Sequence, residues 1–472
     1  MIDAPDLRLS DARGRWVLLA TVLGSGVAML DATVVNIALP VIGRDLGGGL
    51  GALQWIVNGY TLTLAALILL GGSLGDLLGR RRVFVVGALW FAAASLLCAL
   101  APSAWVLVAA RGLQGVGGAL MTPGSLAIIS ASFSAQDRSR AIGAWAGLGG
   151  VAGAAGPFVG GWLLAVASWR WVFVVNIPLV ALVVAVTMRH VPETRDADAS
   201  RQLDVTGALT GAVGLGALTY GLVSLGSSGR SVATVGALLL GVAAMTAFVL
   251  VERRSAHPMV PLDVFASRLF TAVNVVTLLV YAALSGVFFV LVLQLQVVAG
   301  FSPLGSGVAL LPVTVLMLLG SSRVGGLAGR FGARVFMTIG PLVSALGLGL
   351  ALPIGAGSGW LRVLGAVAVF GLGLTLTVAP LTAAVLGAAS TRHAGVASGV
   401  NNAVARTAGL LAVAGLPVAA GLTGNAISDI RVFDAGYERA ILLCIVLLVA
   451  GAVVAALTTG QVRTASPVDV RP

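Results

Sequence analysis

The chain contains no lysine, and charged residues of all kinds make up only 10% of its 472 residues. Soluble globular domains carry roughly 25% charged residues, so this composition excludes an ordinary soluble fold. Hydrophobic residues make up 58% of the chain, and the mean hydropathy is +1.04. Such values also exclude intrinsic disorder, whose signature is low hydrophobicity. The sequence therefore indicates an integral membrane protein, with lipid as the solvent for its apolar surface.

Other residue types and motifs are equally scarce. The two cysteines, Cys98 and Cys444, lie in separate apolar runs, so neither a disulfide framework nor a cysteine metal site is indicated. A phosphate-binding GxxxxGK[ST] loop is impossible without lysine, and no nucleophile, base and oxyanion set is visible. We therefore expect no enzyme activity, no cofactor and no bound metal. The polar start lacks a small-residue cleavage site, so we expect the first apolar run to remain as a helix.

Long apolar runs fill most of the chain. A helix that crosses about 30 Å of hydrocarbon needs about 20 residues. Runs of this length predict an all-α membrane protein with fourteen transmembrane helices. The expected helices lie near residues 16–38, 53–74, 82–101, 104–126, 140–164, 171–188, 205–226, 232–251, 270–296, 305–326, 334–354, 361–385, 395–419 and 440–460.

All 28 basic residues are arginines, and their distribution tests this helix count. Cytoplasmic loops of membrane proteins carry an excess of positive charge. With the amino terminus inside, nineteen arginines fall in cytoplasmic segments and six fall outside. Arg111 and Arg406 fall within helices, and Arg323 falls near a cytoplasmic helix end. The alternation predicts that both termini are cytoplasmic. Because the arginines do not cluster on a soluble face, a nucleic-acid partner is not expected.

An internal repeat divides the chain into two halves. GSLGDLLGRRR (residues 72–82) and GGLAGRFGAR (residues 325–334) share Gly, Leu and Gly at matching offsets. We expect residues 1–188 to form an amino-terminal six-helix bundle and residues 269–472 a carboxy-terminal one with a short tail. Residues 189–268 would form a linker with two extra helices. Parallel repeats of this kind are a known transporter plan, with the substrate site between the halves.

Eight motifs in order resemble those of the fourteen-helix drug:proton antiporters of the major facilitator superfamily. The first five motifs are LDATVVNIALP, LQWIVNGYTL, GSLGDLLGRRR, RGLQGVGGA and GPFVGG, and the last three are WRWVFVVNIP, LDVTGAL and ASGVNNAVARTAG. The chain departs from the family at Leu77, where a basic residue is usual, and at Ala152, where glycine is usual. The resemblance implies the major facilitator fold, with two six-helix bundles and two extra helices between them.

The resemblance also implies a proton-coupled exporter of amphipathic small molecules or drugs in a bacterial cell membrane. Expected partners are this substrate, protons and membrane lipids, and we expect a monomer. An exporter of lipids, siderophores or a self-made natural product on the same scaffold is the alternative. A membrane receptor or scaffold that does not transport is a third reading. One embedded acid favours monocationic, neutral or zwitterionic substrates over dications, which need two compensating carboxylates.

Asp31 is the one acid predicted to lie inside the membrane, and sixteen others are placed in tails or loops. Ionisable residues within the membrane are expensive and mark function by default. At 1.5 Å per residue, Asp31 and Arg111 both lie roughly 6 Å to the outer side of the midplane. We therefore expect Asp31 to carry the proton and Arg111 to bias its protonation, as the resemblance also implies. A permanent structural ion pair is the alternative.

Two further motifs predict conformational devices. Gly153, Gly156, Pro157, Gly160 and Gly161 form the antiport motif of the expected fifth helix, where small residues allow close helix contact and proline bends the helix. Generic close packing would explain the glycines equally well. In the first loop repeat, Asp76 is expected to pair with Arg80, Arg81 or Arg82, or with a helix dipole, and so to act as a latch. Anchoring at the positive-inside surface is the alternative for these arginines.

A substrate cavity is predicted from aromatic, methionine and amide residues, which make adaptable contacts. Arg406, near the middle of the thirteenth expected helix, would pair either with a substrate anion or with backbone carbonyls. Hydrogen bonds between helices are the alternative role for the asparagines beside it. The candidate cavity residues are Trp55, Asn58, Tyr60, Gln114, Met121, Tyr281, Phe288, Phe289, Gln294, Asn401 and Arg406.

Overall fold

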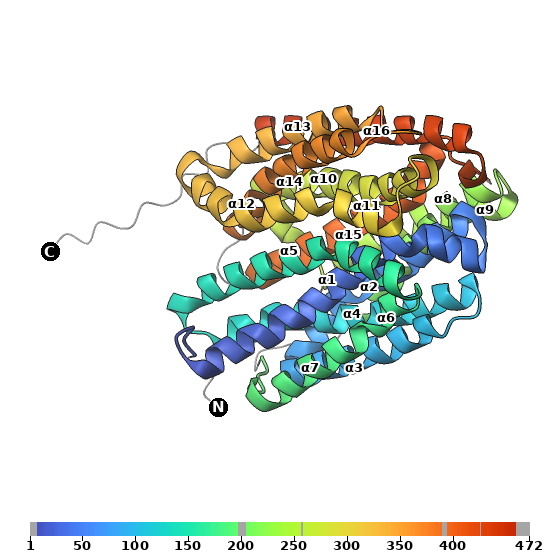
Figure 1. Ribbon diagram of the computed structural model, residues 1–472. Coiled ribbons are helices and arrows are strands. Elements are labelled where there is room, and N and C mark those ends of the chain that lie inside the picture. Colours follow the sequence, from blue (N-terminus) through green and yellow to red (C-terminus); the bar gives the residue numbers. More distant parts are fainter. Residues whose placement is uncertain (1–6, 197–203, 256–257, 389–393, 425, 459–472) are drawn as a thin grey trace.

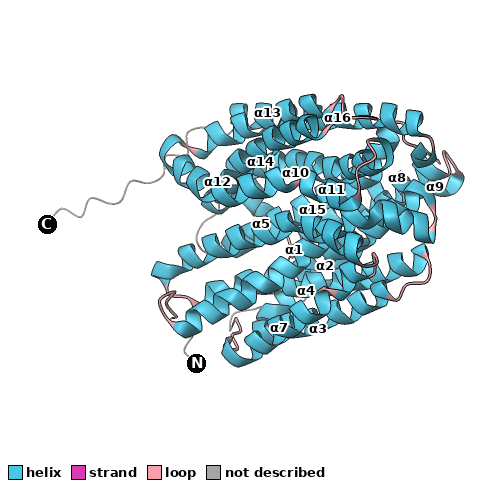
Figure 2. Cartoon of the chain, in the orientation of Figure 1, coloured by secondary structure: helices cyan, strands magenta, loops and turns pink. Residues whose placement is uncertain are grey.

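A computed structural model describes residues 7–196, 204–255, 258–388, 394–424 and 426–458. Within these ranges the protein is helical, apart from one isolated bridge between Leu7 and Phe133 (Figure 2). Fourteen helices of the described chain are long and apolar enough to cross a membrane. The predicted all-α membrane fold and its helix count are therefore confirmed.

The amino-terminal half and the two extra helices occupy the first 254 residues. Their elements are α1 (Ala12–Leu46), α2 (Gly49–Leu78), α3 (Arg80–Ala99), α4 (Ala104–Ser132), α5 (Ala135–Val166), α6 (Trp171–Val174), α7 (Asn176–His190), α8 (Val205–Ser227) and α9 (Val232–Arg254). The carboxy-terminal half contains η1 (Leu262–Ala266), α10 (Arg268–Leu293), the π-helical turn η2 (Gln294–Val298), α11 (Pro303–Ala309), α12 (Leu311–Phe331), α13 (Ala333–Ala351), α14 (Trp360–Ala388), α15 (Ala394–Ala419), η4 (Ala426–Ser428) and α16 (Ile430–Thr458).

Both copies of the loop repeat end in the same backbone device. Gly79 follows α2 with φ 114°, and Gly332 follows α12 with φ 88°. Residues with side chains rarely adopt such φ values. The two glycines let each long helix turn directly into the next one, α3 or α13, without a longer loop. The repeat seen in the sequence is thus a repeated tight turn between paired helices.

Both chain ends lie at one end of the molecule, which we call the terminal end (Figure 1). Contacts between the halves are found towards the other end. There Gln296, in η2, donates a hydrogen bond to the Ile37 carbonyl of α1 at 2.9 Å. Gln54 of α2 donates to the carbonyls of Val413 and Ala414 in α15, at 2.7 and 3.1 Å. Side-chain amides therefore tie the halves together across their interface.

The halves diverge towards the terminal end. α5 and α12 lie close where α5 ends and separate towards the end that carries both termini (Figure 1). The glycines of their terminal-end segments face open space: a Cβ added at Gly143, Gly147, Gly325, Gly326 or Gly329 would meet no atom within 4 Å. This state is therefore closed at the far end and more open at the terminal end.

The extra helices α8 and α9 cover one side of the interface between the halves. α8 packs against α2 and also against α15. After the end of α15, the Gly424 amide donates a hydrogen bond to the Gly226 carbonyl of α8 at 2.8 Å. α9 packs mainly on α8 and leaves large apolar side chains such as Leu239, Leu240 and Val242 exposed. α8 therefore spans both halves, and α9 presents an apolar face of the kind that suits lipid.

Candidate functional site

Asp31 and Arg111 form an ion pair inside the amino-terminal half. Asp31 lies near the middle of α1 and Arg111 lies on α4. An Arg111 Nη1 to Asp31 Oδ2 distance of 2.5 Å joins them. The side chains are 0% and 1% exposed. The predicted matching of their depths is thus realised as direct contact, and each charge compensates the other away from water.

Polar side chains of three helices surround the carboxylate of Asp31. Gln114 of α4 and Asn176 of α7 donate to Oδ1 of Asp31 at 2.9 and 2.8 Å. Both amides also donate to the hydroxyl of Ser95 on α3. Gln114 further accepts a hydrogen bond from Arg111 at 2.6 Å. Each oxygen of the carboxylate therefore has a donor, which offsets the cost of burying the charge.

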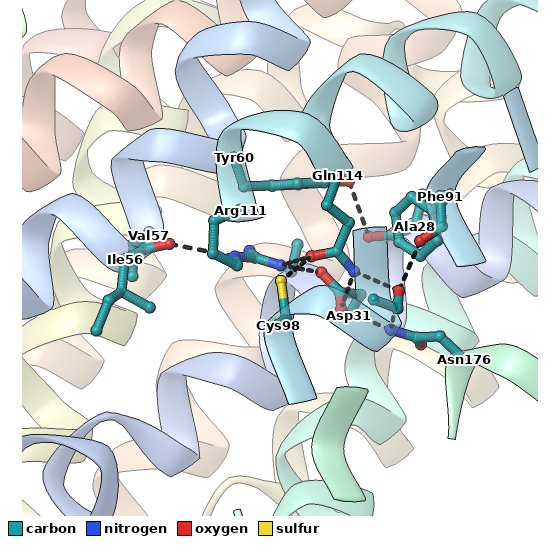
Figure 3. A network of polar contacts seen from close by, with 12 residues as sticks. Ala28, Asp31, Ile56, Val57, Tyr60, Phe91, Cys98, Arg111, Gln114 and Asn176 are labelled. Atoms are coloured by element: carbon teal, nitrogen blue, oxygen red, sulfur yellow. Dashed lines mark hydrogen bonds and ion pairs between the residues drawn. The ribbon is translucent and has the colours of Figure 1, made fainter. Parts of the chain in front are cut away.

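Aromatic rings and a backbone carbonyl hold the guanidinium of Arg111. Its Cζ atom lies 4.4 Å from the centre of the Tyr60 ring and 5.9 Å from that of Phe173. Its Nε donates to the Ile56 carbonyl of α2 at 3.2 Å. Figure 3 shows Asp31 between Arg111 and Asn176, with Gln114 beside it. Cation–π contact and the carbonyl bond fix Arg111 independently of the carboxylate.

In this arrangement, binding of one proton to Asp31 would break its ion pair with Arg111. Arginine does not release its proton in proteins, so Asp31 is the titratable member of the pair. Protonation would cancel the carboxylate charge and leave Arg111 held by the Gln114 side chain, the Ile56 carbonyl and the rings of Tyr60 and Phe173. Removing one charge of a buried pair is costly. A change in protonation therefore alters the energy of packing α1 against α4.

The prediction that the other sixteen acids lie in tails or loops is wrong for six of the described acids. Asp45, Asp76 and Asp137 lie in the end turns of α1, α2 and α5. Three further acids, Glu252, Asp434 and Glu438, lie within the spanning helices α9 and α16. Glu252 is 2% exposed and accepts a hydrogen bond from the Val260 amide at 3.0 Å. Asp434 accepts one from Gln294 at 2.5 Å. All three lie near helix ends, where local donors or solvent replace the counter-ion that Asp31 requires.

The antiport-motif glycines permit close contact on two sides of α5. A Cβ added at Gly156 would overlap Oγ1 of Thr33 on α1, and one at Gly160 would come within 3.0 Å of the Val34 carbonyl oxygen. Thr33 donates to the Gly153 carbonyl at 2.7 Å. At Gly161, a Cβ would lie 2.7 Å from the carbonyl oxygen of Pro303 at the start of α11. The motif thus lies where α5 contacts its own half and the other half.

Pro157 belongs to the same contact between the halves. A Cβ on Gly307 of α11 would overlap the Pro157 carbonyl oxygen. One turn from Pro157, the Ala154 carbonyl accepts a hydrogen bond from Thr314 of α12. Gly150, on the open part of α5, has no atom within 4 Å of an added Cβ. The bend at Pro157 therefore lies close to where α5 leaves the carboxy-terminal half.

The expected latch between α2 and α3 has a second acid. Asp76 pairs with Arg80 at 2.7 Å. Glu193, which follows α7, accepts a hydrogen bond from the Arg81 amide at 3.1 Å and lies 3.8 Å from the side chains of Arg81 and Arg82. The described contacts of these arginines lie within the amino-terminal half and the segment that directly follows α7. Asp76 therefore pairs with Arg80, whereas Glu193 interacts with Arg81 and Arg82.

The residues expected to line a cavity occupy several different environments. Asn58, Met121 and Phe289 are fully buried, with exposures of 1% or less. The others make specific contacts: Trp55 with Tyr220 of α8, Phe288 with Phe370 of α14, and Gln294 with the Ile354 carbonyl and Asp434. Asn401 donates to Asn274 and Thr277 of α10, as the interhelical alternative expected. Tyr60 and Gln114 belong to the Asp31 network.

Sequence reasoning missed Ser95, Asn176 and Glu193. Asn176 lies in the quoted stretch WRWVFVVNIP, where a lone amide at the start of an apolar helix was the available clue. Ser95 gave no comparable clue, because serine is common in membrane helices and satisfies itself by donating to the carbonyl four residues earlier. Glu193 was treated as an ordinary loop acid.

Fourteen spanning helices, two repeated halves and a buried ion pair beside the interface define a membrane transporter. A family model described as Major Facilitator Superfamily matches residues 21–413. The chain belongs to this superfamily.

Curated relatives are more than one-third identical to the chain over the aligned residues. Multidrug resistance protein Stp of Mycobacterium tuberculosis (strain CDC 1551 / Oshkosh) is 37% identical over 82% of this chain and 72% of its own length. The puromycin resistance protein pur8 of Streptomyces alboniger is 35% identical over 89% and 84%. The tetracenomycin C resistance and export protein of Streptomyces glaucescens is 36% identical over 87% and 77%.

Solved structures share the fold at low sequence identity. A POT family transporter in complex with 5-aminolevulinic acid superposes with a TM-score of 0.69 and 15% identity, over 96% of this chain and 99% of its own. An inward-facing bacterial homologue of the human lysosomal transporter Spinster gives a TM-score of 0.65 and 17% identity, over 95% and 97%. These structures therefore share the overall fold of this chain.

Proposed function

We propose that this protein exports amphipathic small molecules in exchange for protons, by alternating access. The single observation that carries this proposal is the carboxylate of Asp31, which is fully buried in the membrane-spanning bundle and paired with Arg111. Ionisable groups at such depth mark proton and substrate pathways. The relatives named for drug resistance and export support the substrate class.

The position of α1 links the proton site to the interface between the halves. α1 carries Asp31, packs against α5 through Thr33, and offers the Ile37 carbonyl to Gln296 of the other half. A change in the Asp31 and Arg111 pair therefore acts on a helix that also forms the closed contact. This connection is the physical basis on which we assign proton coupling to alternating access.

The terminal end is proposed to face the cytoplasm, with both termini inside. Fifteen of the nineteen arginines assigned to that side are described, whereas Arg201, Arg392, Arg463 and Arg471 lie outside the described residues. An excess of arginine on one side is the signature of cytoplasmic loops. In this orientation the structure is inward-open. We further propose a monomer in a bacterial cell membrane, with lipid against α9 and no nucleic-acid partner.

Export of a self-made natural product is the second candidate. It is favoured by relatives whose names specify such compounds, among them the tetracenomycin C protein and a probable actinorhodin transporter of Streptomyces coelicolor. The same site and proton step would serve either substrate class. The organisation proposed above, with residues 189–268 as an inserted linker and helix pair, also fits both.

Reconstituted transport tests the proposal. Purified protein in liposomes is given a pH gradient, and a panel of dyes, antibiotics and lipids is followed with internal pH. Proton movement that depends on substrate, and substrate movement that stops when nigericin and potassium collapse the gradient, support antiport. Substrate movement that is indifferent to the gradient, with no accompanying proton flux, would refute it.

A further inference from the structure

Arg406 is a second arginine in the middle of a membrane helix. It lies close to the midpoint of α15 (Ala394–Ala419), far from either helix end. Long basic side chains near helix ends can reach the interface, but one at the midpoint cannot easily do so. Its side chain is only partly buried. Arg406 therefore needs either water or an anion around its guanidinium.

The described protein supplies Arg406 with no counter-ion. No carboxylate of the described residues lies within 4 Å of it, and it makes no hydrogen bond to a described backbone carbonyl. Asp31, the buried acid in this region, is already neutralised by Arg111. The backbone-carbonyl role left open by the sequence is thus not realised in this state. The positive charge of Arg406 remains uncompensated.

Arg406 lies between the two halves. α15, which carries it, packs against α2 of the amino-terminal half and against α10 of the carboxy-terminal half. α15 itself contacts α10 through Asn401 and α2 through the Gln54 bond to Val413. The guanidinium is therefore placed at the interface where repeat transporters bind substrate.

We propose that Arg406 binds an acidic oxygen of the transported molecule, such as a carboxylate or phenolate. A guanidinium offers five donors in a planar fork that matches such groups. The inference rests on the proposed function and names its substrate class: amphipathic acids and zwitterions that carry an acidic group.

This assignment reverses the usual expectation for a site that contains an embedded carboxylate. Asp31 cannot attract a cation while Arg111 compensates it. Together, Asp31, Arg111 and Arg406 carry a net charge of +1. Electrostatics at this interface therefore favours an anion over a cation of the same size and apolar surface. Monocationic substrates, which a single embedded acid would allow, are therefore disfavoured.

Equilibrium binding of a matched probe series tests the proposal without any gradient. Pyrenebutyrate, its primary amide and pyrenebutylamine share one ring system and differ in charge. Each is titrated at pH 7.5 against protein in nanodiscs, and binding to empty nanodiscs is subtracted. We expect the carboxylate to bind at least about tenfold more tightly than the amide, as for a charge-assisted hydrogen bond, and the amine to bind most weakly.

Two substitutions localise the preference. Arg406→Gln should abolish the difference between carboxylate and amide, and Arg406→Lys should keep part of it. Arg323→Gln is the matched control, because Arg323 is an exposed arginine of α12 whose guanidinium is satisfied by the Leu319 carbonyl. It should leave the difference unchanged. Wild-type protein that binds amide and carboxylate equally would overturn the proposal, as would an Arg406→Gln variant that keeps the preference.

The proposed function is tested separately, by gradient-driven transport of the neutral amide. Antiport of that amide together with no carboxylate preference would reject the Arg406 site and keep the exporter. Conversely, an Arg406-dependent preference in a protein that moves no probe against a proton gradient would keep the binding site and reject the antiporter.

Discussion

The carboxylate of Asp31 accepts hydrogen bonds from three side chains within one half of the protein. Arg111 takes one oxygen, while Gln114 and Asn176 share the other. Hydrogen bonds to a charged carboxylate favour its charged form. The amides therefore support the carboxylate through hydrogen bonds, and Arg111 supplies the charge that makes its burial tolerable.

Asn176→Val tests how much these amide donors contribute. The valine removes one of the two amide donors to Oδ1 while the ion pair with Arg111 stays intact. We expect gradient-driven transport to weaken across its pH profile, because the buried carboxylate loses a hydrogen-bond donor, with unchanged affinity for a neutral substrate. The pH profile of transport in liposomes is the measurement. Asn402→Val, whose amide bonds only within α15, serves as the control and should leave the profile in place.

At this scale the sequence located the ion pair but not its surroundings. Counting residues along each helix gives depth, and equal depth was enough to pair Asp31 with Arg111. Depth does not give the direction in which a side chain points around its helix. For that reason Gln114 was assigned to a cavity, Asn176 and Ser95 were missed, and the burial of Glu252 was not foreseen.

Among the elements, α5 makes close contacts with both halves of the protein. It touches α1 through Gly156 and Gly160, and α11 through Gly161. Each contact depends on the absence of a side chain, so α5 can pack in this way only with glycine at those positions. The same helix becomes open at Gly143 and Gly147 towards the terminal end.

Gly156→Ala should therefore damage the protein where Gly150→Ala does not. A methyl group at position 156 overlaps Thr33, and overpacking of this kind costs about 1–3 kcal/mol. We expect a lower melting temperature in detergent and reduced transport. Gly150→Ala, on the same helix with open space around it, should be neutral or stabilising by up to about 1 kcal/mol through helix propensity. Equal effects of the two substitutions would show that the close contact with Thr33 is unimportant.

Glu193→Ala should loosen the segment that follows α7. Glu193 ties that segment to the α2–α3 turn, where the Arg80 amide also donates to the Thr194 carbonyl at 3.0 Å. We expect trypsin to cleave after Arg195 several times faster in the variant, as measured by mass spectrometry of the peptide that begins at Asp196. Glu438→Ala, near the opposite end of the protein, is the control. An unchanged cleavage rate would contradict the proposed tie.

Helix existence was predictable from the sequence, whereas helix ends were not. Apolar runs report the hydrocarbon thickness, but α1 begins at Ala12 and so includes Arg13 and Arg15, which lie beyond the apolar run. The break between α11 and α12 has a sequence signal, because Pro312 lies in the first turn of α12. The π-helical turn η2 gave no clear pattern.

For the whole molecule, closure of the far end depends on few polar contacts. Gln54 and Gln296 provide hydrogen bonds between the halves. In membranes such bonds contribute about 0.6 kcal/mol on average, which corresponds to a population change of about threefold for each bond. A balance of this size suits a protein that must open at either end during each cycle.

Gln54→Leu combined with Gln296→Leu should shift the protein towards its outward-open state. Spin labels at Arg44 and Ala299, near the far ends of α1 and α10, report the separation of the halves there. We expect a longer-distance population that grows about threefold for each lost hydrogen bond in double electron–electron resonance. Thr246→Val removes a hydroxyl that bonds only within α9 and should change nothing. An unaltered distance distribution in the double variant would mean that these amides do not set closure.

The overall plan was the most predictable level, because the repeat and the alternating arginines record it directly. The conformational state, closed at the far end and more open at the terminal end, was not predictable. Which end is closed depends on small differences between two packings of the same helices, and the residues responsible, such as Gln296, follow no sequence pattern.

The central claim, that Asp31 couples transport to protons, is tested most directly by Asp31→Asn in liposomes. The amide keeps the shape of the side chain but cannot titrate. We predict loss of transport driven by a pH gradient, with exchange of substrate across equal pH retained as evidence of a folded carrier. Asp45→Asn, at the exposed pair with Arg170, should retain both. Full gradient-driven transport by the Asp31→Asn protein would contradict the account.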